Sequence, residues 1–134
     1  MKVIVTIDDQ KGMMFNHRRQ SRDSLLIKDI LNTCGDAPLY MNSYSSSLFK
    51  DNQHIIVNDM FLDMVKEDYC FVENLSLHSY INYIDELIVY KWNRKYPADF
   101  FLDIDLNEWE LISCYDFQGS SHDTITKEIY RRKK

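Results

Sequence analysis

Short apolar runs alternate with helix-like segments through the first two thirds of the chain. The first run, Lys2–Ile7 (KVIVTI), is rich in β-branched residues and almost continuously apolar, which is typical of a strand buried on both faces. Consecutive parallel strands need crossover segments, and helices usually supply them and cover the faces of the sheet. The alternation therefore predicts an α/β fold in three layers, built on a mixed, mostly parallel sheet.

The remaining elements follow from the same patterns. Further strands are expected at Pro38–Met41, His54–Val57, Tyr69–Val72 and Glu86–Lys91. Helices are expected after Ser21 or Asp23 as far as Cys34, and over 43–49, 58–66 and 75–83. We expect a long polar loop over 8–22 and a buried strand at His54–Val57. Trp109–Cys114 and Thr124–Arg131 are strands with no helix between them, which predicts a C-terminal antiparallel strand pair.

Size and composition indicate one globular domain covering residues 1–134. The chain is 45% hydrophobic and contains no apolar run of about 18 residues, the length a membrane span needs, so no membrane association is expected. The start, MKVIVTIDD, is typical of a strand and not of a signal peptide. The three cysteines follow no metal-binding or disulfide spacing, which favours a cytoplasmic location.

Charge is distributed unevenly along the chain. The net charge is −5, but residues 51–116 carry four basic against fourteen acidic residues, whereas residues 1–50 carry seven basic against five acidic ones. Nucleic-acid-binding proteins are usually basic, so this balance argues against nucleic acid as a partner. The acidic middle region instead fits a basic protein partner.

The densest polar cluster is Asn16–Asp23 (NHRRQSRD), between the first strand and the first helix. This position lies at the carboxyl edge of a parallel sheet, where α/β proteins bind ligands. His17, Arg18, Arg19 and Arg22 could together clamp a phosphate or carboxylate, provided that they converge. The alternative is a solvated loop whose arginines pair with the acidic region.

A second cluster, Gly119–Asp123 (GSSHD), joins the last two expected strands. Its serine, histidine and aspartate are the residue types of a hydrolase triad, but adjacent residues in one turn rarely align as nucleophile, base and orienting acid. The chain also lacks a GxSxG motif, so a hydrogen-bonded turn is expected here. The four histidines follow no metal-ligand spacing, and no metal site is predicted.

Several segments together resemble dihydrofolate reductase. They are Asp85–Tyr90 (DELIVY), Ala98–Asp105 (ADFFLDID), Trp109, Ile129–Arg132 (IYRR), Met41–Leu48 (MNSYSSSL) and Gly12–Met14. The resemblance implies a reductase-like fold, places Asp23 near the family's catalytic acid as a proton donor, and puts Asn42 beside the ligand, where the family has glycine.

The resemblance also implies where the family's cofactor, NADPH, would bind. The family holds the pyrophosphate on a paired-glycine turn, but here Tyr69–Val72 runs into Glu73-Asn74. An acidic residue thus stands where phosphate would lie, and the chain has only three glycines to build another phosphate cradle. We therefore expect no cofactor, and weak NADPH binding at most.

Three functions fit these observations. The first is a reductase-like domain with a degenerate NADPH site that binds a small anionic or heterocyclic ligand, such as a nucleotide, at residues 16–23. The second is a non-enzymatic interaction protein, of inhibitor or immunity type, that uses its acidic face. The third is a working NADPH-dependent reductase with a rearranged site. Whether the protein is an enzyme stays open at this point, because fold alone does not select among these functions.

Overall fold

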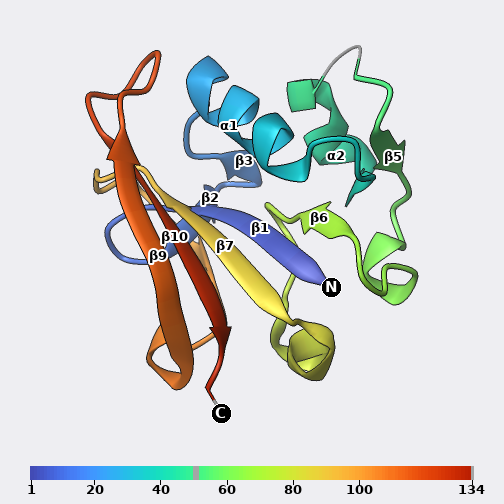
Figure 1. Cartoon of the computed structure of the whole chain (residues 1–134). Helices are drawn as coiled ribbons and strands as arrows, with labels where there is room; N and C mark the ends of the chain where they lie inside the picture. The colour runs from blue at the N-terminus through green and yellow to red at the C-terminus, as the bar shows by residue number, and fades with distance from the viewer. Residues whose placement is uncertain (50–51, 134) are drawn as a thin grey trace.

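A seven-stranded sheet runs through the protein in the strand order β5-β4-β6-β1-β7-β10-β9 (Figure 1). The structure is a computed structural model that describes residues 1–49 and 52–133. The strands are β1 (Lys2–Ile7), β4 (Leu39–Met41), β5 (Ile55–Val57), β6 (Tyr69–Phe71), β7 (Glu86–Lys91), β9 (Trp109–Phe117) and β10 (Ile125–Arg132). Among the described residues of this sheet, the strands pair in parallel except at β10, which runs antiparallel to both of its neighbours. The predicted fold class is confirmed.

The central strand β1 contributes to the core on both faces of the sheet. Val3 and Val5 belong to one buried cluster and Ile4 to the other, as the alternation of side chains along a strand requires. On the side of Ile4 lies α1 (Ser24–Cys34), which buries Leu26 and Ile30. The short α2 (Ser43–Ser46) and η1 (Ser47–Phe49) follow β4 beside α1 (Figure 1).

The opposite face is covered by short 3₁₀ helices instead of the α-helices expected over 58–66 and 75–83. These are η2 (Phe61–Asp63), η3 (His78–Tyr83) and η4 (Leu106–Glu108). The segment 75–83 contains two serines, two tyrosines, a histidine, an asparagine and an isoleucine, all of modest helix propensity. Asp103 accepts hydrogen bonds from the backbone of Leu77 and His78, which fixes the start of η3 as a tight turn.

The expected loop over 8–22 contains a β-hairpin, so that prediction is wrong. A second sheet has the order β3-β2-β8, formed by β2 (Gly12–Phe15), β3 (Arg18–Arg19) and β8 (Phe100–Phe101). The hairpin turn consists of Asn16 and His17, both with positive φ (51° and 63°), as a two-residue turn of this hand requires. Asparagine and histidine adopt this conformation more readily than most residues. The usual Asn-Gly signal is absent, which concealed the turn.

The strand β5 was expected to be buried but forms an edge of the large sheet. Within residues 1–49 and 52–133 it pairs with β4 alone, and Val57 is 49% exposed. An edge position leaves one side of the strand uncovered, and an apolar run alone does not distinguish an edge strand from a central one. In the described part of the chain, no helix is both long enough and apolar enough to cross a bilayer.

Candidate functional site

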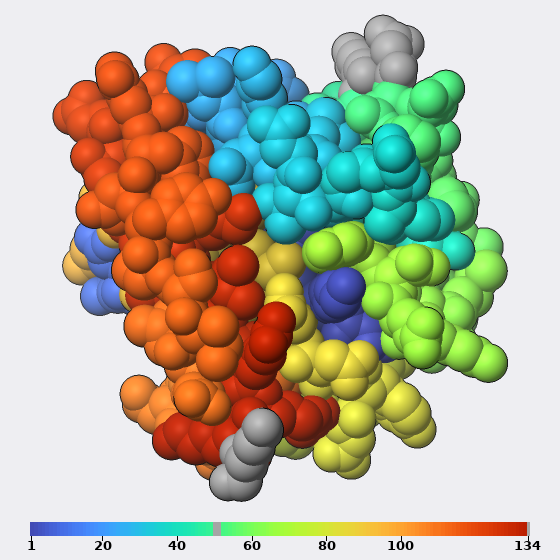
Figure 2. Space-filling view, viewed as in Figure 1, coloured from blue at the N-terminus to red at the C-terminus, as the bar shows by residue number. Residues whose placement is uncertain are grey.

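Three segments meet at the carboxyl edge of the large sheet. They are the end of the hairpin segment at Ser21–Asp23, the start of α1, and the loop of residues 119–123 between β9 and β10 (Figure 1). The backbone N–H of Gly119 donates to the carbonyl of His122 (3.0 Å) and closes this loop into a turn. In Figure 2 the C-terminal strands, orange to red, lie against α1 in light blue, so segments from both ends of the chain share one face.

Asp23 is the centre of the polar network at this edge. It is 3% exposed and forms the N-cap of α1. Its carboxylate accepts hydrogen bonds from the backbone N–H groups of Leu25 (3.0 Å), Leu26 (3.2 Å), Ser120 (2.9 Å) and Ser121 (2.8 Å), from the hydroxyls of Ser120 and Ser121, and from His122 Nδ1 (3.0 Å). The aspartate therefore anchors the loop of residues 119–123 to the first turn of the helix.

These hydrogen bonds determine the charge of Asp23. Burial by itself would raise the pKa of the carboxyl group, but the donors from Ser121, Ser120 and His122 outweigh burial and hold the pKa well below its usual range. Asp23 is thus ionised at neutral pH and carries no proton to donate. This geometry supports an orienting role for Asp23 more than the proton-donor role inferred from the family resemblance.

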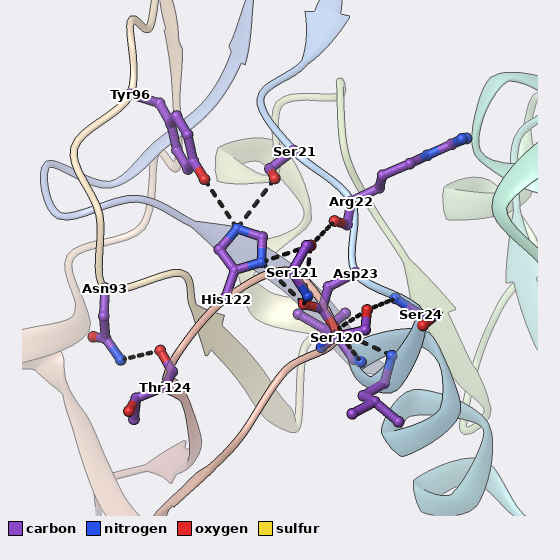
Figure 3. A network of polar contacts seen from close by, with 12 residues as sticks. Ser21, Arg22, Asp23, Ser24, Asn93, Tyr96, Ser120, Ser121, His122 and Thr124 are labelled. Atoms are coloured by element: carbon purple, nitrogen blue, oxygen red, sulfur yellow. Dashed lines mark hydrogen bonds and ion pairs between the residues drawn. The ribbon is translucent and has the colours of Figure 1, made fainter.

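His122 connects Asp23 to two further hydroxyl groups. Its ring is 4% exposed and stacks on Trp92 with centroids 4.5 Å apart. Nδ1 lies 3.0 Å from Asp23 Oδ2, while Nε2 lies 3.1 Å from Ser21 Oγ and 2.9 Å from the Tyr96 hydroxyl (Figure 3). An ionised carboxylate only accepts hydrogen bonds, so the proton is assigned to Nδ1, and Nε2 of the neutral ring is an acceptor.

A pocket of about 650 Å³ opens beside this network. Its polar lining residues are Arg22, Asp23, Ser24, Ser47, Ser120 and Ser121. Ile27 of α1 and Leu48 of η1 supply its apolar part. A smaller cavity shares Arg22, Asp23, Ile27 and Leu48 with this pocket and is also lined by Ser21 and Trp92. The site thus combines one guanidinium, several hydroxyls and an apolar patch.

Arg19 is not at this pocket but in a paired ionic contact. Its Nε donates to Glu73 Oε2 (2.9 Å) and its Nη2 to Glu73 Oε1 (3.1 Å), a two-point guanidinium–carboxylate pair. The side chain of Glu73 is 4% exposed and also accepts a hydrogen bond from Ser45 Oγ (2.8 Å). The guanidinium lies over the ring of Tyr44, with 4.5 Å to its centroid. This arginine is bound to the acidic residue that follows β6.

The other predicted ligand-binding residues lie in separate places. Arg18 is exposed and borders a cavity with Tyr96, whereas His17 borders another one with Asn74. Asn42 caps α2 by accepting from the Ser45 N–H (3.0 Å) and donates to Asn74 Oδ1 (2.9 Å). The three arginines do not converge on one point, because Arg18 and Arg19 border the cavity with Tyr96 whereas Arg22 lines the 650 Å³ pocket. Of the site residues predicted from the sequence, only Arg22 and Asp23 line the 650 Å³ pocket.

Residues 119–123 approach Asp23 so closely that position 119 must be glycine. A Cβ at Gly119 would meet the Asp23 carboxyl group and lie 2.8 Å from Ile125 Cδ1. We expect Gly119→Ala to lower the free energy of unfolding by about 2 kcal/mol, the usual cost of overfilling a packed site. Urea denaturation measures this. The exposed neighbour provides the control, since Gln118→Ala should change stability by less than about 0.5 kcal/mol. Equal stability of the two variants would contradict the close packing.

The sequence patterns missed Ser21, His122 and Tyr96 as partners in one network. Ser21 and His122 are 101 residues apart in the chain. The available signal was that both polar clusters, 16–23 and 119–123, follow strands at one edge of the sheet. In residues 1–49 and 52–133, no group of three histidine, cysteine, aspartate or glutamate side chains is arranged to hold a metal ion.

Comparison with known proteins supports the fold. No protein-family model matches the chain, and no curated protein matches it in sequence. Among solved structures, the chain is similar to dihydrofolate reductase from Enterococcus faecalis, determined in complex with NADP(H) and RAB-propyl. The TM-score is 0.70 at 14% sequence identity, over 99% of this chain and 96% of the reductase chain. The protein therefore has a dihydrofolate reductase-like fold, as the sequence resemblance implied, with a sequence that differs from that enzyme's at most positions.

Proposed function

We propose that this protein is a dihydrofolate reductase-like domain that binds a small anionic, nucleotide-like ligand in the pocket between α1, η1 and the loop of residues 119–123. The observation that carries the proposal is the lining of this pocket, in which Arg22 stands beside several hydroxyls and an apolar surface. Its volume of about 650 Å³ is within the range of roughly 300–1,000 Å³ that small-molecule sites occupy.

The guanidinium and the apolar part of the pocket have chemical counterparts in such a ligand. Arg22 is exposed, and its side chain extends away from His122, so its guanidinium is available to a phosphate or carboxylate (Figure 3). Ile27 and Leu48 offer an apolar surface for a flat heterocycle. The N–H groups of Leu25 and Leu26 already donate to Asp23, as do the hydroxyls of two serines of the lining, Ser120 and Ser121. The charge of Arg22 therefore supplies the recognition of the anion.

The ligand is not expected to be NADPH bound in the manner of the reductase family. Glu73 follows β6 at the place where the resemblance puts the paired glycines, and its carboxylate already accepts from Arg19 and Ser45. A cofactor phosphate there would have to displace a buried, paired carboxylate of the same charge. This supports a degenerate NADPH site over a working reductase with a rearranged site.

The interaction-protein alternative has support of its own. Exposed apolar side chains lie at both edges of the large sheet, with Ile56 and Val57 on β5 and Leu111 and Ile112 on β9. Exposed edge strands can pair with other chains. Several acidic residues of the middle region, however, are bound within the protein, as Glu73 is to Arg19 and Glu86 is to Arg131. This reduces the charge available to a basic partner.

Thermal unfolding with added ligands tests the proposal. We expect inorganic phosphate, adenosine monophosphate or dihydrofolate to raise the melting temperature and NADPH to have the weakest effect. A ligand at 100 times its dissociation constant stabilises a protein by about 2.7 kcal/mol. Added chloride should reduce the shift, because contacts to an exposed guanidinium are screened by salt.

The matched variants are Arg22→Ala and Arg18→Ala, because both arginines are exposed but only Arg22 lines the pocket. Arg22→Ala should abolish the ligand-induced shift, and Arg18→Ala should retain it. If no anion raises the melting temperature, or if both variants respond like the wild type, the ligand-binding proposal is wrong. The interaction protein then becomes the leading function.

A further inference from the structure

We propose that Ser21, His122 and Asp23 form a nucleophile–base–orienting-acid relay, with which the protein hydrolyses esters of small carboxylic acids. The proposal places a reaction beside the pocket proposed above as the ligand site, in the small cavity that Ser21 lines. It does not require the anion contact to Arg22. The relay is assembled from two loops that the fold brings together, and not from the adjacent residues of the turn 119–123.

The distances along the relay are those of a hydrogen-bonded chain. Ser21 Oγ lies 3.1 Å from His122 Nε2, and His122 Nδ1 lies 3.0 Å from Asp23 Oδ2. Both fall in the range of about 2.6–3.2 Å expected for a nucleophile, its base and the group that orients the base. The serine and the aspartate use different nitrogens of the ring, so Nε2 can accept the serine proton while Nδ1 stays bonded to the carboxylate.

The orientation of His122 is determined by its surroundings. The ring stacks on Trp92 and is 4% exposed, so it has little freedom to rotate. Asp23 is held by the start of α1 and by the backbone of Ser120 and Ser121. A buried, ionised aspartate of this kind fixes the tautomer of the histidine and stabilises the imidazolium that forms when the histidine takes a proton.

Ser21 borders a small cavity of about 10 Å³ next to the pocket. Ser21 is half-buried and lines the small cavity that shares Arg22, Asp23, Ile27 and Leu48 with the 650 Å³ pocket. The proposal therefore requires that an ester seated on Ile27 and Leu48, which line both spaces, extends its carbonyl group into this small cavity.

Tyr96 has a separate influence on the relay. Its hydroxyl lies 2.9 Å from the same Nε2 atom that faces Ser21. A neutral imidazole nitrogen has one lone pair, so the two hydroxyls compete to donate to it. We therefore expect removal of the tyrosine hydroxyl to increase the reactivity of Ser21.

Ester hydrolysis by the relay proceeds in two steps, acylation of Ser21 and hydrolysis of the acyl-serine. Ser21 Oγ forms a bond to the ester carbonyl carbon as its proton moves to His122 Nε2, and the C–O bond to the leaving alcohol breaks as that alcohol takes the proton. Water then attacks the acyl-serine and gives one proton to His122, which returns it to Ser21 Oγ as the carboxylic acid leaves. Water is the only co-reactant, and nothing is oxidised or reduced.

A serine-directed probe tests the nucleophile directly. Diisopropyl fluorophosphate should add one diisopropylphosphoryl group to the full chain, and peptide mass mapping should place it on Ser21. Ser21→Ala should give no adduct, Tyr96→Phe should label faster, and Ser113→Ala, on β9 outside the site, should label like the wild type. Hydrolysis of p-nitrophenyl acetate should fall by on the order of 100-fold in His122→Asn, the lower part of what general-base catalysis contributes.

The labelling result for the relay can be told apart from the melting-temperature result for the ligand proposal. Ser21 does not line the large pocket, so Ser21→Ala should keep the phosphate-induced rise in melting temperature while losing the adduct. Circular dichroism and the melting temperature report whether each variant is folded. A folded wild-type protein that takes up no label, an adduct on another residue, or full ester hydrolysis by Ser21→Ala would each overturn the relay, whatever the phosphate result.

Discussion

Replacing Arg19 by alanine is expected to lower the free energy of unfolding by about 3 kcal/mol, because removing one partner of a buried ion pair leaves the other charge uncompensated. The carboxylate left behind is that of Glu73, whose side chain is 4% exposed. Of its hydrogen bonds named above, only the one from Ser45 would remain. The variant also loses the contact between the guanidinium and the ring of Tyr44.

Neighbouring arginines provide the controls for this prediction. Arg18→Ala and Arg22→Ala remove exposed side chains from the same segment and should change stability by less than about 0.5 kcal/mol. Adding Glu73→Gln to Arg19→Ala should restore part of the loss, because the neutral amide no longer buries an unpaired charge. Urea denaturation of the five proteins measures these effects. Equal losses for all three arginines would show that the pair with Glu73 contributes little.

Replacing Asp23 by asparagine is expected to have the largest effect on stability, a loss of about 4 kcal/mol, since a buried charge with several donors is removed. One carboxylate oxygen becomes an NH₂ group, which then faces the N–H groups or hydroxyls of Ser120 and Ser121 as a second donor. The matched control is Asp36→Asn, beyond the other end of α1, where the side chain is fully exposed.

We expect Asp23→Asn to change how the free energy of unfolding depends on pH. The folded-state pKa of Asp23 is lowered, so its contribution is complete above the unfolded-state value of about 3.9 and is lost as the pH falls from there toward the folded-state pKa. Stability of the wild type should therefore decrease steeply below about pH 4, and that of Asp23→Asn less steeply. Urea titrations at neutral pH and at two acidic values measure the slopes. Parallel slopes would mean that Asp23 is not held ionised by its partners.

The parts of the fold that sequence alone predicts are those with strong local patterns. Lys2–Ile7 and Glu86–Lys91 are apolar enough to require burial on both sides, and both are central strands. The hairpin at Asn16-His17 was missed because its turn lacks glycine. The sequence predicted an α-helix where the structure has a 3₁₀ helix over 78–83. Local patterns could not reveal this, because the start of that helix donates hydrogen bonds to Asp103, which belongs to a distant segment.

The candidate site likewise combines features that the sequence alone predicts with features that only the tertiary structure shows. Residue types in the sequence determined that Asn16–Asp23 and Gly119–Asp123 are polar clusters at the ends of strands, and the family resemblance predicted that Glu73 occupies the position of the phosphate-binding glycines. Only the tertiary structure decided that Arg19 pairs with Glu73, that Arg22 lines the pocket, and that Ser21 faces His122 from 101 residues away. The physical reason is that composition and periodicity report which groups need burial or solvent, whereas the choice of partner depends on which segments the strand order places side by side.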